Sequence, residues 1–357
     1  MTPTRRGRTV LGLIIALLLV GGGVIAVVLL GGKAGQGIVG QSPTPNASEP
    51  GSSPSPPPPV CPYSGMTLAN VPLRPALAVK VENLPSARPQ TGLSWADIVY
   101  EEPVEGGITR FIAIYQCQDA ARIEPVRSAR FTDVDILVQL GKPVFGYAGG
   151  VAAVESAVRR AGIIDVNYQT VRGAKAYHRD PNRLAPHNLY TSTKELYAAA
   201  RGLFQPAAPE PLFTYTSRLP KRVGKKVTVV HAPFSTASDV FWRWSSSKRV
   251  WLRFHGTVPH VSSDGTQFSA KNVIVQVVKT ELTDVTDANG VRSPKAITVG
   301  TGKAYVFRGG KVIVGKWVRS SVHDVTKYLD SKGQEIPLSI GNTWIELLPV
   351  DKHLTFS

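Results

Sequence analysis

The sequence predicts an α+β protein, in which an N-terminal mixed α/β domain precedes a mainly antiparallel β domain, behind one transmembrane helix and a disordered stalk. Three observations lead to this prediction. An uncharged apolar run lies near the N-terminus, a Pro- and Ser-rich segment follows it, and the remaining pattern changes once, from strands interrupted by helices to strands alone. With 43% hydrophobic residues among 357, the chain can bury a core, which excludes a wholly disordered protein.

Residues 10–32 carry no charged side chain. At about 1.5 Å per residue, a helix of this length crosses the ~30 Å hydrocarbon core of a membrane. A cleaved signal peptide is the alternative, although its apolar centre is normally shorter, about 7–15 residues. Arginines precede the run and only Lys33 follows it closely, which by the positive-inside rule leaves residues 1–9 in the cytoplasm. We therefore expect a single-pass protein of the cytoplasmic membrane with its folded domains outside.

Residues 33–60 are dominated by Gly, Ser, Pro and other small or polar residues, which bury almost no apolar area. Proline keeps such a segment extended, so a disordered stalk is expected here. A Pro-rich passage then divides the folded part in two. The predicted boundaries are 61–204 for the first domain, 205–223 for a linker, 224–350 for the second domain and 351–357 for a tail.

The first domain reads as strands with helices between them. Segments 75–81, 96–100 and 108–116 are short, rich in branched and aromatic residues, and bounded by Pro or Gly, which is typical of strands. Segment 151–162 has helical spacing of apolar residues and ends on glycine, and segment 193–202 begins with threonine as a helix cap and also ends on glycine. This half is therefore expected to be mixed α/β.

The second domain reads as strands alone. The turns between them contain Asp264-Gly265, Asn289-Gly290 and Gly309-Gly310, which supply the positive φ that tight hairpins need. An antiparallel sheet is the simplest arrangement of such strands. The expected strands are 226–231, 249–255, 272–278, 295–300, 304–307, 311–318 and 343–348.

The chain has two cysteines, too few for a four-thiolate zinc site. Cys61 opens the folded part and Cys117 follows a predicted strand, so in an oxidising space we expect a disulfide between them, with two buried thiols as the alternative. No HExxH motif is present, and GTGKA at 300–304 lacks the first glycine and the Ser or Thr of a phosphate loop. We therefore expect neither a metal nor a cofactor.

The densest group of polar residues lies in the first domain. Asp97 and Glu101 share one face of a predicted strand, and Glu105 follows in a loop, so these carboxylates are the candidates for acid–base catalysis. Arginine forks match carboxylate and phosphate oxygens, so the arginines nearby predict a pocket for an anionic ligand, and a lattice of ion pairs that fixes loops is the alternative. These arginines are Arg88, Arg110, Arg127 and Arg130.

Other polar residues are expected to complete the ligand site. Ser128 lies in RSAR rather than in a G-x-S-x-G elbow, so a hydrogen bond within the arginine cluster is its expected role. His187 and Asn188 could bond a polar ligand, and a capped turn is the alternative. The full set of predicted ligand-binding residues is Asn83, Arg88, Gln90, Arg110, Arg127, Ser128, Arg130, His187 and Asn188.

Long motifs in both halves are similar to those of the bacterial YerB-like lipoprotein family, whose activity is unknown. The motifs are RPALAVKVEN, ARPQTGLSWADIVYEEPVEGGITRF, PVRSAR, PHNLY, NVIVQ, GTGKAYVFRGGKVIVGKW and GNTWIELLP, and together they span most of the chain from Leu73 to Pro349. The resemblance implies an envelope protein exposed outside the cytoplasmic membrane, with an N-terminal and a C-terminal family domain. The positions most characteristic of the family are Asn83, Arg88, Gln90, Asp97, Glu101, Glu105, Thr109, Arg110, Arg127, Ser128 and Arg130.

The chain departs from that family at two places. Many relatives look lipid-anchored through a cysteine, whereas this chain has the apolar run 10–32. The family also tends to place serine after a Gly-Gly pair, and here Gly149-Gly150 is followed by Val151, which removes a nucleophile from that position.

The formal net charge is +16, from 41 Lys and Arg against 25 Asp and Glu. Such a charge attracts polyanions, which outside a bacterial membrane are anionic cell-wall polymers and peptidoglycan rather than nucleic acid, and solubility alone is the alternative. Two hypotheses follow. The first is an envelope protein that binds or organises anionic wall polymer through the arginine site, with the cytoplasmic membrane as its other partner. The second is a wall-modifying hydrolase or transferase that uses Asp97, Glu101 or Glu105.

Overall fold

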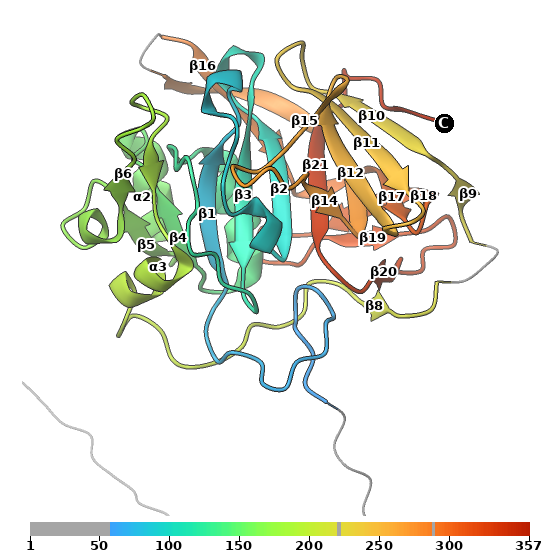
Figure 1. Ribbon diagram of the computed structural model, residues 1–357, viewed down its shortest axis with the longest axis horizontal. Coiled ribbons are helices and arrows are strands. Elements are labelled where there is room, and N and C mark those ends of the chain that lie inside the picture. The colour runs from blue at the N-terminus through green and yellow to red at the C-terminus, as the bar shows by residue number, and fades with distance from the viewer. Residues whose placement is uncertain (1–57, 220–222, 288–289) are drawn as a thin grey trace, which may run out of the picture. The chain divides into compact units, whose positions relative to one another are not determined.

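Strands from both halves of the sequence form the largest sheet of the computed structural model, which describes residues 58–219, 223–287 and 290–357 (Figure 1). The cytoplasmic tail, the membrane span predicted at 10–32 and most of the stalk predicted at 33–60 lie outside these residues. The order of the strands, from edge to edge, is β19 (Lys327–Leu329), β18 (Lys311–Arg319), β17 (Gly300–Arg308), β15 (Asn272–Thr286), β21 (Thr343–Pro349), β2 (Ile98–Pro103), β3 (Thr109–Tyr115), β1 (Leu77–Glu82), β4 (Val144–Tyr147) and β5 (Ile164–Asn167).

The last long strand, β21, joins the two halves. It pairs in parallel with β15 on one side and with β2 on the other, and every one of its residues is buried. A strand covered on both faces needs a nearly continuous apolar sequence, which TWIELLP supplies apart from Glu346. The two predicted domains therefore share one sheet in space. Two further strands pair off this path, β16 (Arg292–Ile297) with β15 and β9 (Lys225–Lys226) with β18.

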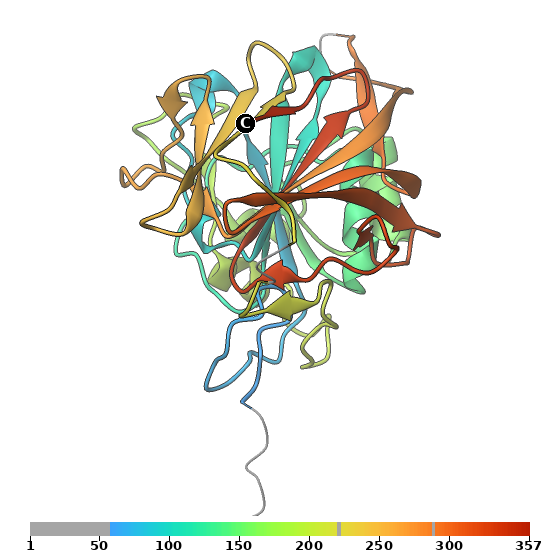
Figure 2. The same cartoon turned by 90° about the vertical axis from the view of Figure 1, so that its right-hand side faces the viewer.

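A smaller antiparallel sheet covers one face of the large one, and Figure 2 shows it on the side opposite the green helices α1 and α2. Alternate residues of β11 are buried, as expected for a strand with one face on a core. Trp242 and Trp251 of this sheet pack with Trp344 of β21 and Phe307 of β17. The strands are β13 (Val258–Pro259), β12 (Val250–His255), β11 (Asp239–Ser245), β10 (Val229–Pro233) and β22 (Thr355–Phe356), with β14 (Ser269–Ala270) beside β12.

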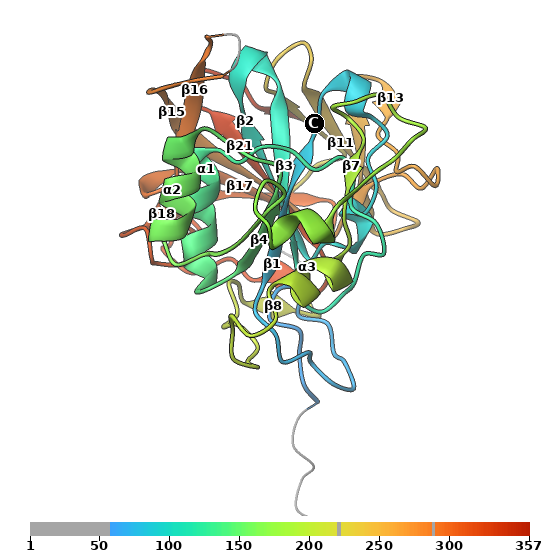
Figure 3. The same ribbon diagram turned by 90° about the vertical axis from the view of Figure 1, so that its left-hand side faces the viewer.

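Few helices accompany the strands. Helices α1 (Phe131–Leu137) and α2 (Ala152–Arg160) lie side by side, as Figure 3 shows, and their apolar residues join the core on the other face of the large sheet. Helix α3 (Thr193–Ala199) packs into the core on the small-sheet face. The helices predicted at 151–162 and 193–202 are confirmed, although the cap of α3 is Ser192, whose Oγ accepts a hydrogen bond from the N–H of Glu195. The protein is thus mostly β.

Two pairs of short strands complete the structure. They are β6 (His178–Arg179) with β7 (Leu189–Tyr190), and β8 (Tyr215–Thr216) with β20 (Leu338–Ser339). The predicted disulfide is confirmed, because Cys61 and Cys117 are bonded with their Cα atoms 6.0 Å apart. It connects the start of the described chain to the end of β3.

Candidate functional site

The polar residues that the sequence groups together separate into three places in the structure. Strand β2 explains the separation, because successive side chains of a strand point to opposite faces. Glu101 points toward the small sheet, Glu102 points toward helix α1, Asp97 precedes the strand, and Glu105 follows it in a turn of 3₁₀ helix (Glu105–Gly107). The three candidate acid–base residues therefore do not share a site.

Asp97 lies beside the disulfide and is completely buried. Its Oδ2 accepts hydrogen bonds from the backbone N–H of Gln116 at 2.8 Å and of Cys117 at 3.1 Å. Burial raises the pKa of Asp97, and these N–H bonds partly oppose that effect. Asp97 thus holds the end of β3 in place next to the bonded cysteine.

Glu101 is the centre of a buried network between the two sheets. Its carboxylate accepts hydrogen bonds from Arg253 Nη2, from Asn83 Nδ2 at 3.2 Å and from Thr109 Oγ1 at 2.5 Å. Gln90 extends the network by donating to Asn83 Oδ1 at 3.1 Å. All five of these side chains are fully buried, so they connect the two halves of the chain rather than face a ligand.

His260 continues this network on the small sheet. Burial, followed by the charge of Arg253, lowers the pKa of His260 far below its usual range, so its ring is neutral. Because Arg253 Nη1 is a donor at 3.3 Å from Nδ1, Nε2 carries the proton and donates to Gln90 Oε1 at 2.7 Å. Arg253 and His260 were missed in the sequence. The available signal was Arg253 itself, a charge on the same strand face as the core residue Trp251.

Glu346 of β21 lies opposite Glu101 in the parallel pair. Burial first, and the charge of Glu101 second, raise the pKa of Glu346 well above its usual range, so one carboxyl of the pair is neutral in the folded state. Its Oε1 accepts a hydrogen bond from Trp242 Nε1 at 2.8 Å. Glu346 was also missed, although a carboxylate inside the apolar run TWIELLP is unusual.

Four of the predicted ligand residues line an open cavity of about 600 Å³ on the opposite face of the sheet. Strands β1, β4 and β5 run parallel, and their carboxyl ends border this cavity. Ligands of parallel sheets characteristically bind at that edge. We call the cavity the arginine pocket, and its polar and backbone lining includes Glu105, Arg110, Arg127, Ser128, Arg130, Gly149, Gly150 and Ser293.

Backbone hydrogen bonds fix the arginines at this edge. The N–H of Arg127 donates to the carbonyl of Lys80 in β1, and the carbonyl of Arg127 accepts from Ala148 after β4, both at 2.9 Å. The segment with Arg127 and Ser128 is therefore held between the ends of two strands. Ser128 Oγ donates to the carbonyl of Ala148 at 3.1 Å, so the hydroxyl bonds the backbone rather than an arginine side chain.

Two of the arginines in the pocket have carboxylate partners. Arg130 donates to both oxygens of Glu105, at 2.7 and 2.6 Å, and Arg127 Nε lies 3.0 Å from Glu82 Oε1. Burial would raise the pKa of Glu105, but the hydrogen bonds and charge of Arg130 outweigh it and lower that pKa to about 2. Glu105 therefore stays ionised at neutral pH and cannot serve as a general acid there.

Arg110 has no carboxylate within ion-pairing distance among the residues that the structure describes. Its Nη1 donates to the carbonyl of Ser128 at 3.0 Å, and its buried Nε has no hydrogen-bond partner there. The residue is only 6% exposed. Burial, followed by the charges of Arg130 and Arg127, lowers the pKa of Arg110 to about 10, so it is still cationic at neutral pH. Among the described residues, the pocket thus contains one buried guanidinium that has no carboxylate in direct contact.

A second buried charge group lies behind the arginine pocket, between β1 and helix α1. Lys80 is fully buried and contacts Glu102 and Asp133, the latter at 2.6 Å. Burial, followed by the charge of Asp133, raises the pKa of Glu102 to about 7. Asp133 also accepts from the backbone N–H of Arg130 at 2.6 Å, which fixes the start of α1. This group supports the pocket but does not line it.

The remaining predicted ligand residues lie away from the arginine pocket. Arg88 is half-buried and donates to the carbonyls of Asn83 and Ala237, at 3.0 and 3.2 Å, and it shares a different cavity with His187. Asn188 Oδ1 accepts from Arg179 at 2.7 Å and its Nδ2 donates to the carbonyl of Asp180 at 3.2 Å. Asn188 therefore stabilises its own loop.

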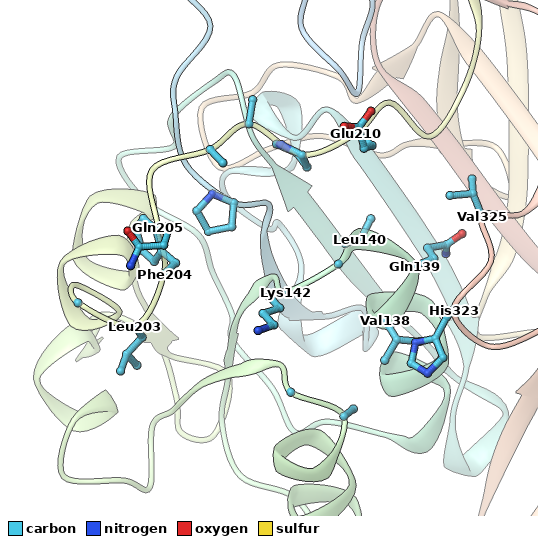
Figure 4. Close-up of a pocket in the computed structure, with 18 residues that line it drawn as sticks. Val138, Gln139, Leu140, Lys142, Leu203, Phe204, Gln205, Glu210, His323 and Val325 are labelled. Atoms are coloured by element: carbon cyan, nitrogen blue, oxygen red, sulfur yellow. The ribbon is translucent and has the colours of Figure 1, made fainter. Parts of the chain in front are cut away.

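A larger groove, of about 900 Å³, lies next to the end of α1 and the segment 203–210 (Figure 4). Most of the side chains labelled in Figure 4 are apolar or uncharged. The ionisable ones, Lys142, Glu210 and His323, come from different segments of the chain. No set of convergent polar groups appears there. Elsewhere in the described chain, no cluster of three or more His, Cys, Asp or Glu side chains is arranged to hold a metal ion.

Comparison with known proteins identifies the relatives of this chain. Residues 64–204 match the family described as the N-terminal domain of a protein of unknown function, DUF3048, and residues 230–345 match its C-terminal domain. A Bacillus subtilis (strain 168) protein named "Putative lipoprotein YerB" is 28% identical over 296 residues, which cover 81% of this chain and 86% of that protein. The crystal structure of YerB protein from Bacillus subtilis is similar with a TM-score of 0.72 at 26% identity, covering 83% of this chain and 99% of that one.

The predicted localisation is contradicted by this comparison. The relative is named a lipoprotein, a class that an attached lipid rather than a spanning helix holds to the membrane. Within 58–219, 223–287 and 290–357, no helix combines the length and the apolar character needed to cross a bilayer. The prediction of a single-pass protein of the cytoplasmic membrane was wrong; it rested on the hydropathy of residues 10–32 and on the basic residues that flank them.

Proposed function

The chain belongs to the YerB-like family of DUF3048 proteins, and from that premise we propose that it is an envelope protein that binds an anionic cell-wall polymer through the arginine pocket. The observation that carries the proposal is Arg110. A buried guanidinium without a carboxylate in direct contact is costly, because desolvation penalises the charge and the more distant charges of Glu105 and Glu82 offset only part of that penalty. A ligand anion would supply the missing partner.

The chemistry of the pocket favours a phosphate or carboxylate. Arginine presents planar pairs of N–H donors that match two oxygens of either group. Helix α2 starts at the pocket after Gly149, Gly150 and Val151, and no side chain caps its N-terminus. The free N–H groups and the positive end of the helix dipole add to the attraction that Arg110 exerts on an anion.

Charge across the whole molecule agrees with a polymeric ligand. The formal net charge of +16 attracts polyanions over distances of about a Debye length, ~8–10 Å at physiological salt. The pocket would then hold one phosphate or carboxylate of the polymer in a fixed place. The catalytic alternative gains no support, because Asp97, Glu101 and Glu105 are apart and each is occupied by hydrogen bonds or an ion pair.

Replacing Arg110 by methionine is expected to weaken polymer binding by about 10- to 100-fold, the value of one or two charge-assisted hydrogen bonds. The same change should leave thermal stability unchanged or raise it, because it removes a buried charge that has no partner. Binding is measured by pelleting the protein with purified wall that retains its anionic polymers, at low and moderate salt.

The matched control is Arg243→Met, which removes the same charge from an exposed position on the small sheet. It should bind like the wild type apart from a small general effect of charge. Wall stripped of its anionic polymers should pellet less of the wild-type protein. Equal binding by the Arg110 and Arg243 variants would show that charge alone, and not the pocket, attracts the polymer.

A further inference from the structure

Ser86, His187 and Glu82 form a chain of hydrogen bonds at a cavity separate from the arginine pocket. Ser86 Oγ lies 3.2 Å from His187 Nε2, and His187 Nδ1 lies 2.8 Å from Glu82 Oε2. Both distances are within the range in which a nucleophile contacts its base and the base contacts an orienting group. Ser86 and His187 are 101 positions apart in the sequence, so no local motif reveals their contact.

The order of the three groups assigns their protons. An ionised carboxylate only accepts hydrogen bonds, so Nδ1 of His187 is the donor to Glu82. In the neutral ring Nε2 then carries a lone pair, and Ser86 donates its hydroxyl proton to it. This is the tautomer that a general base for serine requires. The other oxygen of Glu82 lies 3.0 Å from Arg127 Nε, so both oxygens of the carboxylate are held.

Exposure is graded along the chain of hydrogen bonds. Glu82 is 1% exposed as a side chain, His187 is 19% exposed, and Ser86 is at the surface. A nucleophile must reach its substrate whereas the orienting carboxylate works best when buried. Ser86 also follows the end of β1 in a short turn of 3₁₀ helix (Pro85–Ala87), which presents its hydroxyl beyond the carboxyl end of the strand.

One loop places the base and also holds the turn that carries the serine. Arg183 donates to the carbonyls of Ala87 and Pro89, at 2.6 and 3.1 Å, on either side of Arg88. The backbone N–H of His187 donates to the carbonyl of Leu184 at 2.9 Å, which holds the backbone that carries the ring. The contact between Ser86 and His187 is thus part of a connected arrangement rather than a chance approach of two surface side chains.

A cavity of about 610 Å³ opens directly on these groups. Nine of its eleven lining residues are polar or charged, so it suits a small acyl group rather than a long hydrocarbon chain. Among the described residues, none accepts a hydrogen bond from the backbone N–H of Ser86, which leaves a donor for a developing oxyanion. The lining residues are Ser86, Arg88, Pro89, Thr91, Arg122, Glu124, Asp180, Arg183, Leu184, His187 and Ser263.

We propose that Ser86, His187 and Glu82 are the nucleophile, general base and orienting carboxylate of a site that hydrolyses small carboxylic esters. Ser86 Oγ bonds to the ester carbonyl carbon while its proton moves to His187 Nε2, and the carbonyl electrons form an oxyanion. Collapse of this intermediate breaks the bond to the alcohol oxygen, which takes the proton from His187. Water then attacks the acyl-Ser86 ester in the same way, releasing the carboxylic acid and restoring the serine.

The test uses purified full-length protein, a fluorophosphonate probe and p-nitrophenyl acetate. The wild type should form a phosphonyl adduct on Ser86, located by peptide mass spectrometry, and should hydrolyse the ester. Ser86→Ala should lose both, and His187→Gln should slow both by about 100-fold or more, which is the usual contribution of a general base. p-Nitrophenyl laurate should be a poor substrate.

The matched control is His178→Gln. His178 is a histidine that also bonds a glutamate, Glu195 at 2.5 Å. There, however, the carboxylate lies between the histidine and Ser192, so the order serine–histidine–carboxylate is not formed. This variant should keep the wild-type rates. Three results would overturn the proposal: no adduct on Ser86 in the wild type, equal rates in the two histidine variants, or an adduct without ester turnover. Polymer pelleting by Ser86→Ala should stay at the wild-type level, so failure here is separable from failure of the arginine-pocket proposal.

Discussion

Replacing Arg253 by methionine is expected to lower the free energy of unfolding by about 3–5 kcal/mol, the cost of removing one partner from a buried ion pair. Glu101 would lose its ion-pair partner while remaining fully buried opposite Glu346. The guanidinium also stacks against Phe111, Trp242 and Trp344 at 5.2–5.6 Å, which adds packing between the two sheets. Urea unfolding followed by tryptophan fluorescence measures the loss.

The control for this variant is Glu346→Gln, which imitates the neutral carboxyl. Its amide oxygen can accept from Trp242 and its amide N–H can donate to Glu101, as the protonated glutamate does. Because the pKa of Glu346 is raised in the folded state, the stability that its protonation provides is fully present below its unfolded pKa and is lost as the pH rises. Glu346→Gln should therefore be at least as stable as the wild type at pH 8. A loss below 1 kcal/mol for Arg253→Met would contradict the structural role given to this network.

Removing the disulfide by Cys61→Ser and Cys117→Ser is expected to cost about 4 kcal/mol, the chain-entropy value for a loop of this length. The two cysteines are 56 positions apart, so the crosslink restricts much of the N-terminal half of the unfolded chain. Buried Asp97 beside the bond would also lose part of the support for its contacts with the N–H groups of Gln116 and Cys117. Denaturant unfolding of the double variant measures the cost.

Reduced wild-type protein provides the comparison for the disulfide variant. Its unfolding midpoint in excess thiol should fall to that of the double variant, since both lack the same crosslink. The double variant itself should not respond to the thiol. If oxidised wild type and double variant unfolded at the same denaturant concentration, the bond would not contribute to the stability of the fold.

The local spacing of apolar residues was enough to predict most of the individual strands and helices. Strand β3 and helix α2 follow directly from the apolar spacing of their residues and, for α2, from Gly162, which has a φ of 72° after the helix end. Helix α1 was missed. It is short, and its start is fixed by Asp133, which accepts from the N–H of Arg130, rather than by a typical capping residue.

Pairing between distant strands was not predictable in the same way. The strand at β21 was expected, but its periodicity does not say that it inserts in parallel between β2 and β15. Alternation along β2 and β3 then places Glu101 on the face that the small sheet covers and Arg110 on the opposite face. The carboxylates and arginines that are neighbours in the sequence are therefore divided between two faces of one sheet.

Chemistry that depends on residues far apart in sequence was the least predictable. His187 was among the candidates, but its partners Ser86 and Glu82 were not, because only the fold brings residues 82–86 next to the loop before β7. Arg110, in contrast, was selected for its residue type alone. What the sequence could not indicate is that Arg127 and Arg130 have carboxylate partners and Arg110 does not.

The central claim is that Arg110 receives the anion, and its Nε–H resonance reports on this directly. We would follow the arginine Nε–H signals of the ¹⁵N-labelled protein during titration with a glycerol-phosphate oligomer. The Arg110 signal should move in a saturable way, at lower concentrations than that of exposed Arg243, and the saturation should be absent in Arg110→Met. A fixed Arg110 signal while the oligomer still binds would contradict the claim and place the binding surface elsewhere.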